Sequence, residues 1–93
     1  MVRKYEGVFI LRPEVEKDAL EQQISVIQEI MTKQGGKVDQ WERWGKRPLA
    51  YRVQKQTEGQ YIMARFTLDS KNVQALEQNL KLREDILRFM VVK

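Results

Sequence analysis

The chain has 93 residues, with 17 lysines and arginines against 13 aspartates and glutamates, and it contains no cysteine and no histidine. This length suits one domain, residues 1–93, and is too short for two independent ones. The missing residue types exclude disulfides, thiolate nucleophiles, imidazole bases and the usual transition-metal ligands. No apolar stretch is long enough to cross a membrane. We therefore expect a soluble binding domain with no catalytic site, no cofactor and no metal.

The N-terminal part predicts a strand followed by an amphipathic helix. Residues 5–11 are rich in strand formers and largely apolar on both faces, which places this strand inside a sheet. No small-residue cleavage site follows it, so we interpret the N-terminus as structure and not as a signal peptide. Residues 14–34 carry apolar side chains at helical spacing, and Gly35-Gly36 supplies a left-handed cap that ends the helix. The apolar stripe consists of Leu20, Ile24, Ile27 and Met31.

The segment 37–55 is extended but polar, which predicts a strand at a sheet edge. Pro48 favours that position because a proline in a central strand removes a ladder hydrogen bond. Gly45 indicates a bulge or bend just before it. Residues 56–59 are interpreted as the turn that leads to the next strand.

The remaining elements complete a recognisable order. Residues 60–68 alternate and predict a strand with one apolar face, Asp69 or Ser70 caps a second helix, and residues 86–92 form the last strand. Two helices and four strands in this order predict an α+β, ferredoxin-like βαββαβ sandwich. In that fold a four-stranded antiparallel sheet carries both helices on one face, with the first and third strands in the middle.

Positive charge is concentrated in the middle of the chain. Residues 33–65 hold eight of the cationic and only three of the acidic residues, and residues 14–32 hold one and five. Such a distribution steers a polyanion to one side of the molecule. The run 44–55 interleaves cations with aromatic residues and has no acidic residue, which is typical of a surface that binds nucleic acid.

Six cations are the candidate RNA contacts, because lysine and arginine are common phosphate ligands. The competing interpretation is a solvated edge strand, where basic side chains also prevent aggregation. For Arg3, as for the neighbouring Lys4, the alternative is a solvated terminus. For the last strand we expect the side chain of Arg88 on the sheet face away from the helices. The candidates are Arg3, Lys46, Arg47, Arg52, Lys55 and Arg88.

The aromatic residues of this segment have two possible roles. Trp41 and Trp44 are three apart on an extended segment, so they point to opposite faces. We expect one to cover the sheet edge and the other to anchor a protein partner, since exposed tryptophan is enriched in interface hot spots. Tyr51 either stacks on a base or packs, and packing is favoured because Leu49 shares its face.

The acidic residues 14, 16, 18 and 21 do not predict a catalytic pair. Glu14, Glu16, Asp18 and Glu21 begin a helix, where negative side chains complement the dipole.

Four sequence motifs resemble one known family, the bacterial-type small-subunit ribosomal protein six. The strongest is the segment 45–53, similar to a family signature in which a glycine and a basic residue precede Leu-Ala-Tyr and a β-branched residue. Tyr5-Glu6, the segment 35–38 and the segment 82–93 also match, in order, so the resemblance covers nearly the whole chain. Pro48 departs from the pattern, because the family usually has a second charged or polar residue there. Many members also continue beyond the position of Lys93 with a charged or flexible tail.

The resemblance implies a structural protein of the small ribosomal subunit. It implies binding to ribosomal RNA of the central domain together with ribosomal protein eighteen, location on a cytoplasmic or organellar ribosome, and neither catalysis nor a small-molecule substrate nor a membrane.

Two other functions share this topology. A free-standing RNA-recognition-motif protein for single strands needs an aromatic-rich third strand, and the segment 58–66 lacks most of that pattern. An acyl phosphatase needs a glycine-rich, phosphate-binding loop after the first strand, whereas the loop 12–16 is acidic and repels phosphate.

Overall fold

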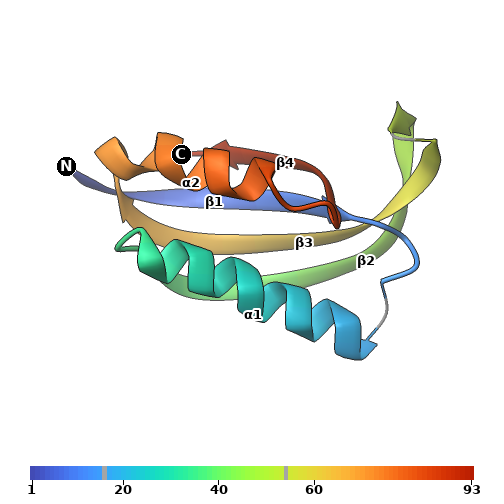
Figure 1. The fold of residues 1–93 in the computed structure, drawn as a ribbon, viewed down its shortest axis with the longest axis horizontal. Helices are drawn as coiled ribbons and strands as arrows, with labels where there is room; N and C mark the ends of the chain where they lie inside the picture. The colour runs from blue at the N-terminus through green and yellow to red at the C-terminus, as the bar shows by residue number, and fades with distance from the viewer. Residues whose placement is uncertain (16, 54) are drawn as a thin grey trace.

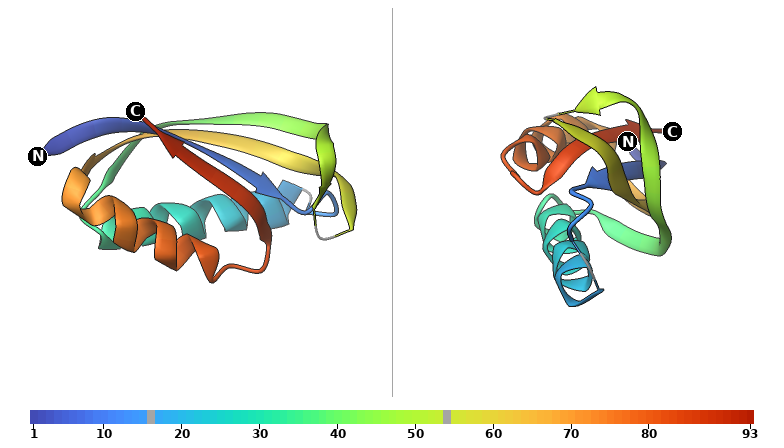
Figure 2. Two further views of the ribbon diagram at one scale, coloured as in Figure 1. Left: turned by 90° about the horizontal axis from the view of Figure 1, so that it is seen from above. Right: turned by 90° about the vertical axis from the view of Figure 1, so that its right-hand side faces the viewer.

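The computed structural model describes residues 1–15, 17–53 and 55–93, which form four strands, two α-helices and one 3₁₀ turn. Both helices lie on the same face of one sheet, as the two views of Figure 2 show. The elements in chain order are β1 (Val2–Leu11), α1 (Lys17–Lys33), β2 (Lys37–Val53), β3 (Gln56–Asp69), η1 (Ser70–Asn72), α2 (Val73–Lys81) and β4 (Ile86–Val92) (Figure 1).

The sheet is antiparallel and has the strand order β2-β3-β1-β4. The first and third strands are therefore central, and β2 and β4 are the two edges. This arrangement confirms the predicted ferredoxin-like fold.

Alternation along β1 and β3 decides which side chains enter the core. On β1, Tyr5, Phe9 and Leu11 are buried beneath the helices, while the intervening side chains lie on the other face. The predicted stripe of α1 is buried against them without exception. The core consists of Tyr5, Phe9, Leu11, Leu20, Ile24, Ile27, Met31, Ile62, Ala64, Phe66, Leu68, Leu76, Leu80 and Ile86.

The predicted glycine cap closes α1, but neither Asp69 nor Ser70 caps α2, whose N-cap is Asn72 and makes no side-chain capping bond. Gly35 has φ = 84°, and the amide of Gly36 donates to the carbonyl of Met31 over 2.9 Å, which closes α1 with a left-handed residue. Asp69 caps η1 by accepting from the amide of Lys71, and this bond lowers the pKa of its carboxyl.

The turn between β2 and β3 and the start of α1 differ from the sequence prediction. The turn predicted at residues 56–59 is wrong, because β3 already begins at Gln56, which pairs with Val53. The reversal instead uses Lys55, whose φ of 68° supplies the left-handed residue that a tight turn needs. The helix starts at Lys17 and not at residue 14, and Glu16 of the predicted acidic stretch lies outside the described residues.

In the part of the chain that the structure describes, no helix is long and apolar enough to cross a membrane.

Gly59 holds the base of the β2–β3 hairpin close to β1, and this close approach yields a test. A Cβ on Gly59 would stand 2.4 Å from Cγ2 of Ile10 and 3.2 Å from the carbonyl oxygen of Leu11. Alanine elsewhere in a strand is more stable than glycine, but here we expect Gly59→Ala to lower the free energy of unfolding by about 1–3 kcal/mol through overpacking. Chemical denaturation of the two proteins measures this difference in the free energy of unfolding.

The matched control is the same substitution in an Ile10→Ala background. Because the clash involves the side chain of Ile10, Gly59→Ala costs less there. An equal loss in both backgrounds would show that the contact is not the cause.

Candidate nucleic-acid interface

The sheet face opposite the helices, called the open face below, carries a row of side chains across three strands. Ile10 on β1 pairs with Tyr61 on β3 and with Arg88 on β4, so all three project to this face. In the neighbouring row Val8 pairs with Met63 and Met90. Met90 is 61% exposed and Val92 43%. The open face is thus apolar in its middle and uncovered beside β4.

A bulge in β2 adds an aromatic residue to this face. The register between β2 and β3 shifts between Arg43 and Gly45, and Gly45 has φ = 82°, as the sequence predicted for a bulge here. Trp44 therefore stacks beside Tyr61, with ring centroids 6.5 Å apart. The guanidinium of Arg47 lies over the Trp44 ring at 5.2 Å.

Trp41 and Trp44 lie on opposite sides of the sheet, as their spacing predicted. Trp41 packs beside Phe9 at the core, and its indole nitrogen donates to Oε1 of Gln28 over 3.0 Å. It is therefore the tryptophan that covers the sheet edge and joins β2 to α1. Trp44 is left as the candidate anchor for a partner.

The far part of the hairpin, residues 47–53 and 55–58, is called the hairpin arm below. It turns sharply away from the rest of the sheet (Figures 1 and 2). Strands β2 and β4 are opposite edges, about 14 Å apart across three strand spacings. Yet the guanidinium of Arg88 lies only 4.9 Å from the ring centroid of Tyr51. The arm therefore curls across the end of the sheet and meets β4.

Tyr51 corrects one interpretation from the sequence. Its side chain was expected to pack with Leu49, but it is 59% exposed and meets Arg88 instead. The alternation argument fails because the register shifts again between Pro48 and Val53, which releases the arm from the plane of the sheet. Leu49 is half-buried, with its side chain close to Gly59.

Internal ion pairs sort the cations of this region into two groups. Arg43 donates two hydrogen bonds of 2.6 Å to the carboxylate of Glu21 on α1, and Arg65 donates to Glu6 over 2.9 Å. The carboxylate bonds raise the pKa of both arginines, and the Arg43 bond lowers the pKa of Glu21. Both cations are therefore neutralised by the protein itself.

The other group keeps its charge for an external anion. Among described residues, these cations have no carboxylate within salt-bridge distance, and all are exposed. They are Arg47, Arg52, Lys55 and Arg88. Lys46 is exposed in the same strand, opposite Gln60.

Arg3 is separated from the other candidates. It lies in β1, opposite Leu68, whereas the hairpin arm begins beyond the other end of β1 at Leu11. Eight residues of strand, about 26 Å, separate these ends. The structure thus brings five of the six predicted cations to one end of the sheet and leaves Arg3 at the opposite end.

Tyr61 and the exposed apolar side chains of β4 were not among the predicted site residues. The signal was present, since alternation in residues 86–92 puts Arg88, Met90 and Val92 on one face. In the described residues no group of His, Cys, Asp and Glu side chains is arranged to hold a metal ion.

Comparison with known proteins identifies the family. The family model described as ribosomal protein S6 matches residues 4–93. The chain belongs to the ribosomal protein S6 family. Members of this family are structural proteins and not enzymes, and RNA binding is their general role.

Relatives and a solved structure agree with this assignment. The chain is 35% identical to small ribosomal subunit protein bS6 of Moorella thermoacetica over 92 residues, covering 99% of this chain and 94% of that protein. It is 39% identical to the protein of the same name from Synechococcus elongatus over 89 residues, covering 96% and 83%. The crystal structure of ribosomal protein S6 from Thermotoga maritima superposes with a TM-score of 0.88 at 33% identity, covering 98% of this chain and 86% of that one.

The Glu21–Arg43 pair predicts a pH-dependent contribution to stability. A carboxyl whose pKa is lowered on folding stabilises the protein above its unfolded pKa, and this contribution is lost as pH falls through the lowered value. We expect Glu21→Gln to lower the melting temperature slightly at neutral pH, and the difference to vanish in acid. The effect is small because both side chains are about half exposed. Thermal unfolding across an acidic pH series measures it, and a difference that persists in acid would contradict this account.

The Arg88–Tyr51 contact predicts local stabilisation of the hairpin arm. An exposed cation–π contact is worth about 0.5–1 kcal/mol, and Phe supplies the same ring face as Tyr. We expect Tyr51→Ala to speed amide hydrogen exchange in the arm, with Tyr51→Phe as the matched control that leaves it nearly unchanged. Equal exchange in the two variants would show that the ring does not hold the arm.

Proposed function

We propose that this chain is a structural constituent of the small ribosomal subunit that binds ribosomal RNA of the central domain together with ribosomal protein eighteen. One observation carries the RNA part: cations from β2 and β4 meet at one end of the sheet without carboxylate partners among the described residues. Family membership supports the ribosomal context. The protein then works on the ribosome, in the cytoplasm.

The hairpin arm and the neighbouring Arg88 of β4 provide the RNA-binding surface in this proposal. Arg47, Arg52, Lys55 and Arg88 are exposed, so each can reach a phosphate without burying an uncompensated charge. Arg47 and Arg88 are also positioned by the rings of Trp44 and Tyr51, which reduces the side-chain freedom lost on binding. Lys46 extends this surface along β2.

The open face provides the surface for the protein partner. Its exposed apolar side chains beside β4 and the Trp44–Tyr61 stack are typical of an interface core, where aromatic and methionine side chains are enriched. Arg47 borders this surface and the hairpin arm alike. A partner on the open face and RNA on the arm would therefore be neighbours, which fits binding as a heterodimer.

The RNA-recognition-motif alternative has less support. That mode stacks bases on aromatic side chains of the two central strands. On the open face β3 offers Tyr61, but β1 offers Glu6, Val8 and Ile10. Tight binding of a short unstructured RNA by this chain alone would favour it.

Single alanine substitutions test the RNA surface. With ribosomal protein eighteen present, Arg47→Ala, Lys55→Ala and Arg88→Ala each weaken binding to a central-domain RNA fragment. Each lowers the slope of log affinity against log salt by about 0.7–0.9, the value of one phosphate contact. Filter binding across a salt series measures both quantities. We expect a smaller effect from Arg3→Ala, because Arg3 lies at the other end of β1.

The matched control is Lys33→Ala on α1. The ammonium group of Lys33 pairs with Glu29 on the surface of the same helix. This substitution leaves the slope unchanged. Failure of the unmodified chain to join the RNA fragment with ribosomal protein eighteen would refute the proposed function. Normal slopes in Arg47→Ala, Lys55→Ala and Arg88→Ala would relocate the site.

A further inference from the structure

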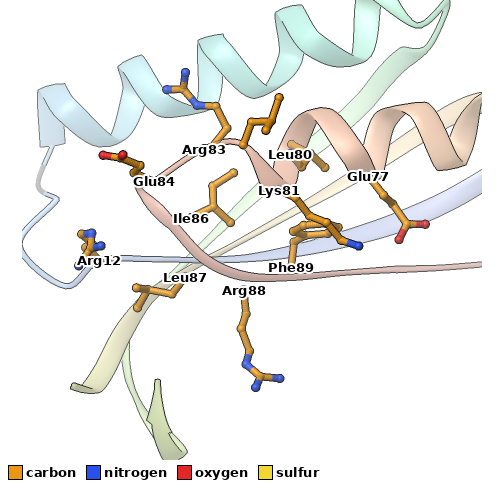
Figure 3. Close-up of a pocket in the computed structure, with 11 residues that line it drawn as sticks. Arg12, Glu77, Leu80, Lys81, Arg83, Glu84, Ile86, Leu87, Arg88 and Phe89 are labelled. Atoms are coloured by element: carbon orange, nitrogen blue, oxygen red, sulfur yellow. The ribbon is translucent and has the colours of Figure 1, made fainter. Parts of the chain in front are cut away.

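A hollow of about 680 Å³ lies where the end of α2, the following loop and the start of β4 meet the end of β1 (Figure 3). Its size matches that of known ligand sites. Its lining combines apolar side chains, among them Ile86 and Phe89, with charged ones. The charged lining residues are Arg12, Glu77, Lys81, Arg83, Glu84 and Arg88.

The cations of this hollow extend in different directions. In Figure 3 Arg83 points towards α1, and Arg88 points to the opposite side of β4. Side chains arranged in this way do not converge on one small anion. They suit an extended polyanion that passes along the hollow and offers a separate phosphate to each cation.

Arg83 is held in place but has few acceptors. Its Nη2 donates to Oε1 of Gln23 over 3.3 Å, and Gln23 is fixed in turn by a 2.8 Å bond from its Nε2 to Asp85. Its Nε is buried and has no hydrogen-bond partner among the described residues. A phosphate oxygen is a stronger hydrogen-bond acceptor for the guanidinium of Arg83 than the amide oxygen of Gln23.

The hollow lies at the same end of the sheet as the hairpin arm. Leu11, at the end of β1, pairs with Gln60 beside the arm and with Ile86 at the hollow. Arg88 belongs to both places, since it lines the hollow and contacts Tyr51 of the arm. Apart from Arg88, the cations of the arm and those of the hollow lie on different elements and can each contact a separate phosphate of one strand.

We infer that this hollow is a second RNA-contact site, in which Lys81, Arg83 and Arg12 bind the phosphodiester backbone of the RNA that the hairpin arm holds. The inference rests on the proposed function, because the arm must bind the same molecule. It extends the contact surface from β2 around the end of the sheet to α2. None of these three residues was a candidate from the sequence.

The two carboxylates that line the hollow allow a test in which RNA affinity rises instead of falling. Glu77 and Glu84 repel a phosphate that approaches the hollow. Removing a negative charge there strengthens binding if the hollow is used, and has no such effect if the RNA stays on the arm.

The experiment measures salt-dependent binding of the central-domain RNA fragment, with ribosomal protein eighteen present. Lys81→Ala is the primary variant, because Lys81 is exposed in the last turn of α2 and alanine preserves the helix. It lowers the slope of log affinity against log salt by about 0.7–0.9. Arg12→Ala does the same, and Glu84→Gln raises the affinity at low salt. Lys71→Ala, in η1 before the start of α2, is the control.

Arg83 requires a separate variant, because it also joins the loop to α1 through Gln23. Arg83→Lys keeps the charge and loses the planar donor fork, so binding weakens while the slope is kept. Inorganic phosphate and a nucleoside monophosphate, titrated as separate probes, bind weakly if the site needs a polymer.

The outcomes separate this inference from the proposed function. If Arg47→Ala lowers the slope while Lys81→Ala, Arg12→Ala and Glu84→Gln have no effect, the inference is wrong and the proposed function stands. If the unmodified protein does not bind the RNA, both fail. Tight binding of free phosphate, abolished by Lys81→Ala, would identify a small-anion site and overturn the RNA assignment.

Discussion

Burial of alternate side chains of β1 and β3 beneath α1 and α2 is the constraint on which the other features depend. Each fully buried large apolar side chain contributes about 1.5–3 kcal/mol, and the two central strands bury Phe9, Phe66, Leu11, Ile62 and Leu68 completely. Exposed ion pairs such as Arg43–Glu21 contribute much less, because solvent screens the attraction between the two charges. The core therefore fixes which face of the sheet the helices cover, and the ion pairs only adjust it.

Covering one face leaves the other free for function. Because side chains alternate, the residues between the core positions of β1, β3 and β4 all project to the open face. The helices cannot reach them, and several remain exposed beside β4. The same geometry makes β2 an edge strand, whose outer part is free to leave the sheet. The partner surface and the hairpin arm are thus two results of one packing arrangement.

Charge is sorted by the fold as well as by the sequence. Arg43 and Arg65 are as basic as their neighbours along the chain, but carboxylates on α1 and β1 neutralise them. The cations of the arm lie beyond these carboxylates, and none of them pairs with a carboxylate among the described residues. Whether a cation belongs to the proposed RNA surface therefore depends on whether a carboxylate of the protein pairs with it, more than on the local density of positive charge. This pairing also keeps that surface at the end of the sheet, away from the middle of the open face.

The sequence by itself determined the order of the elements, the apolar stripe of α1, the central position of β1 and β3, and the bulge at Gly45, because these follow from local periodicity and backbone preference. It also identified most cations of the candidate surface and the opposite orientation of the two tryptophans. Only the tertiary structure decided that Tyr51 faces Arg88, that Arg3 is remote, and that Lys81 and Arg83 border a hollow next to the arm. These relations join residues far apart in the chain, through register shifts and through the curl of the hairpin, and no local pattern encodes such distances.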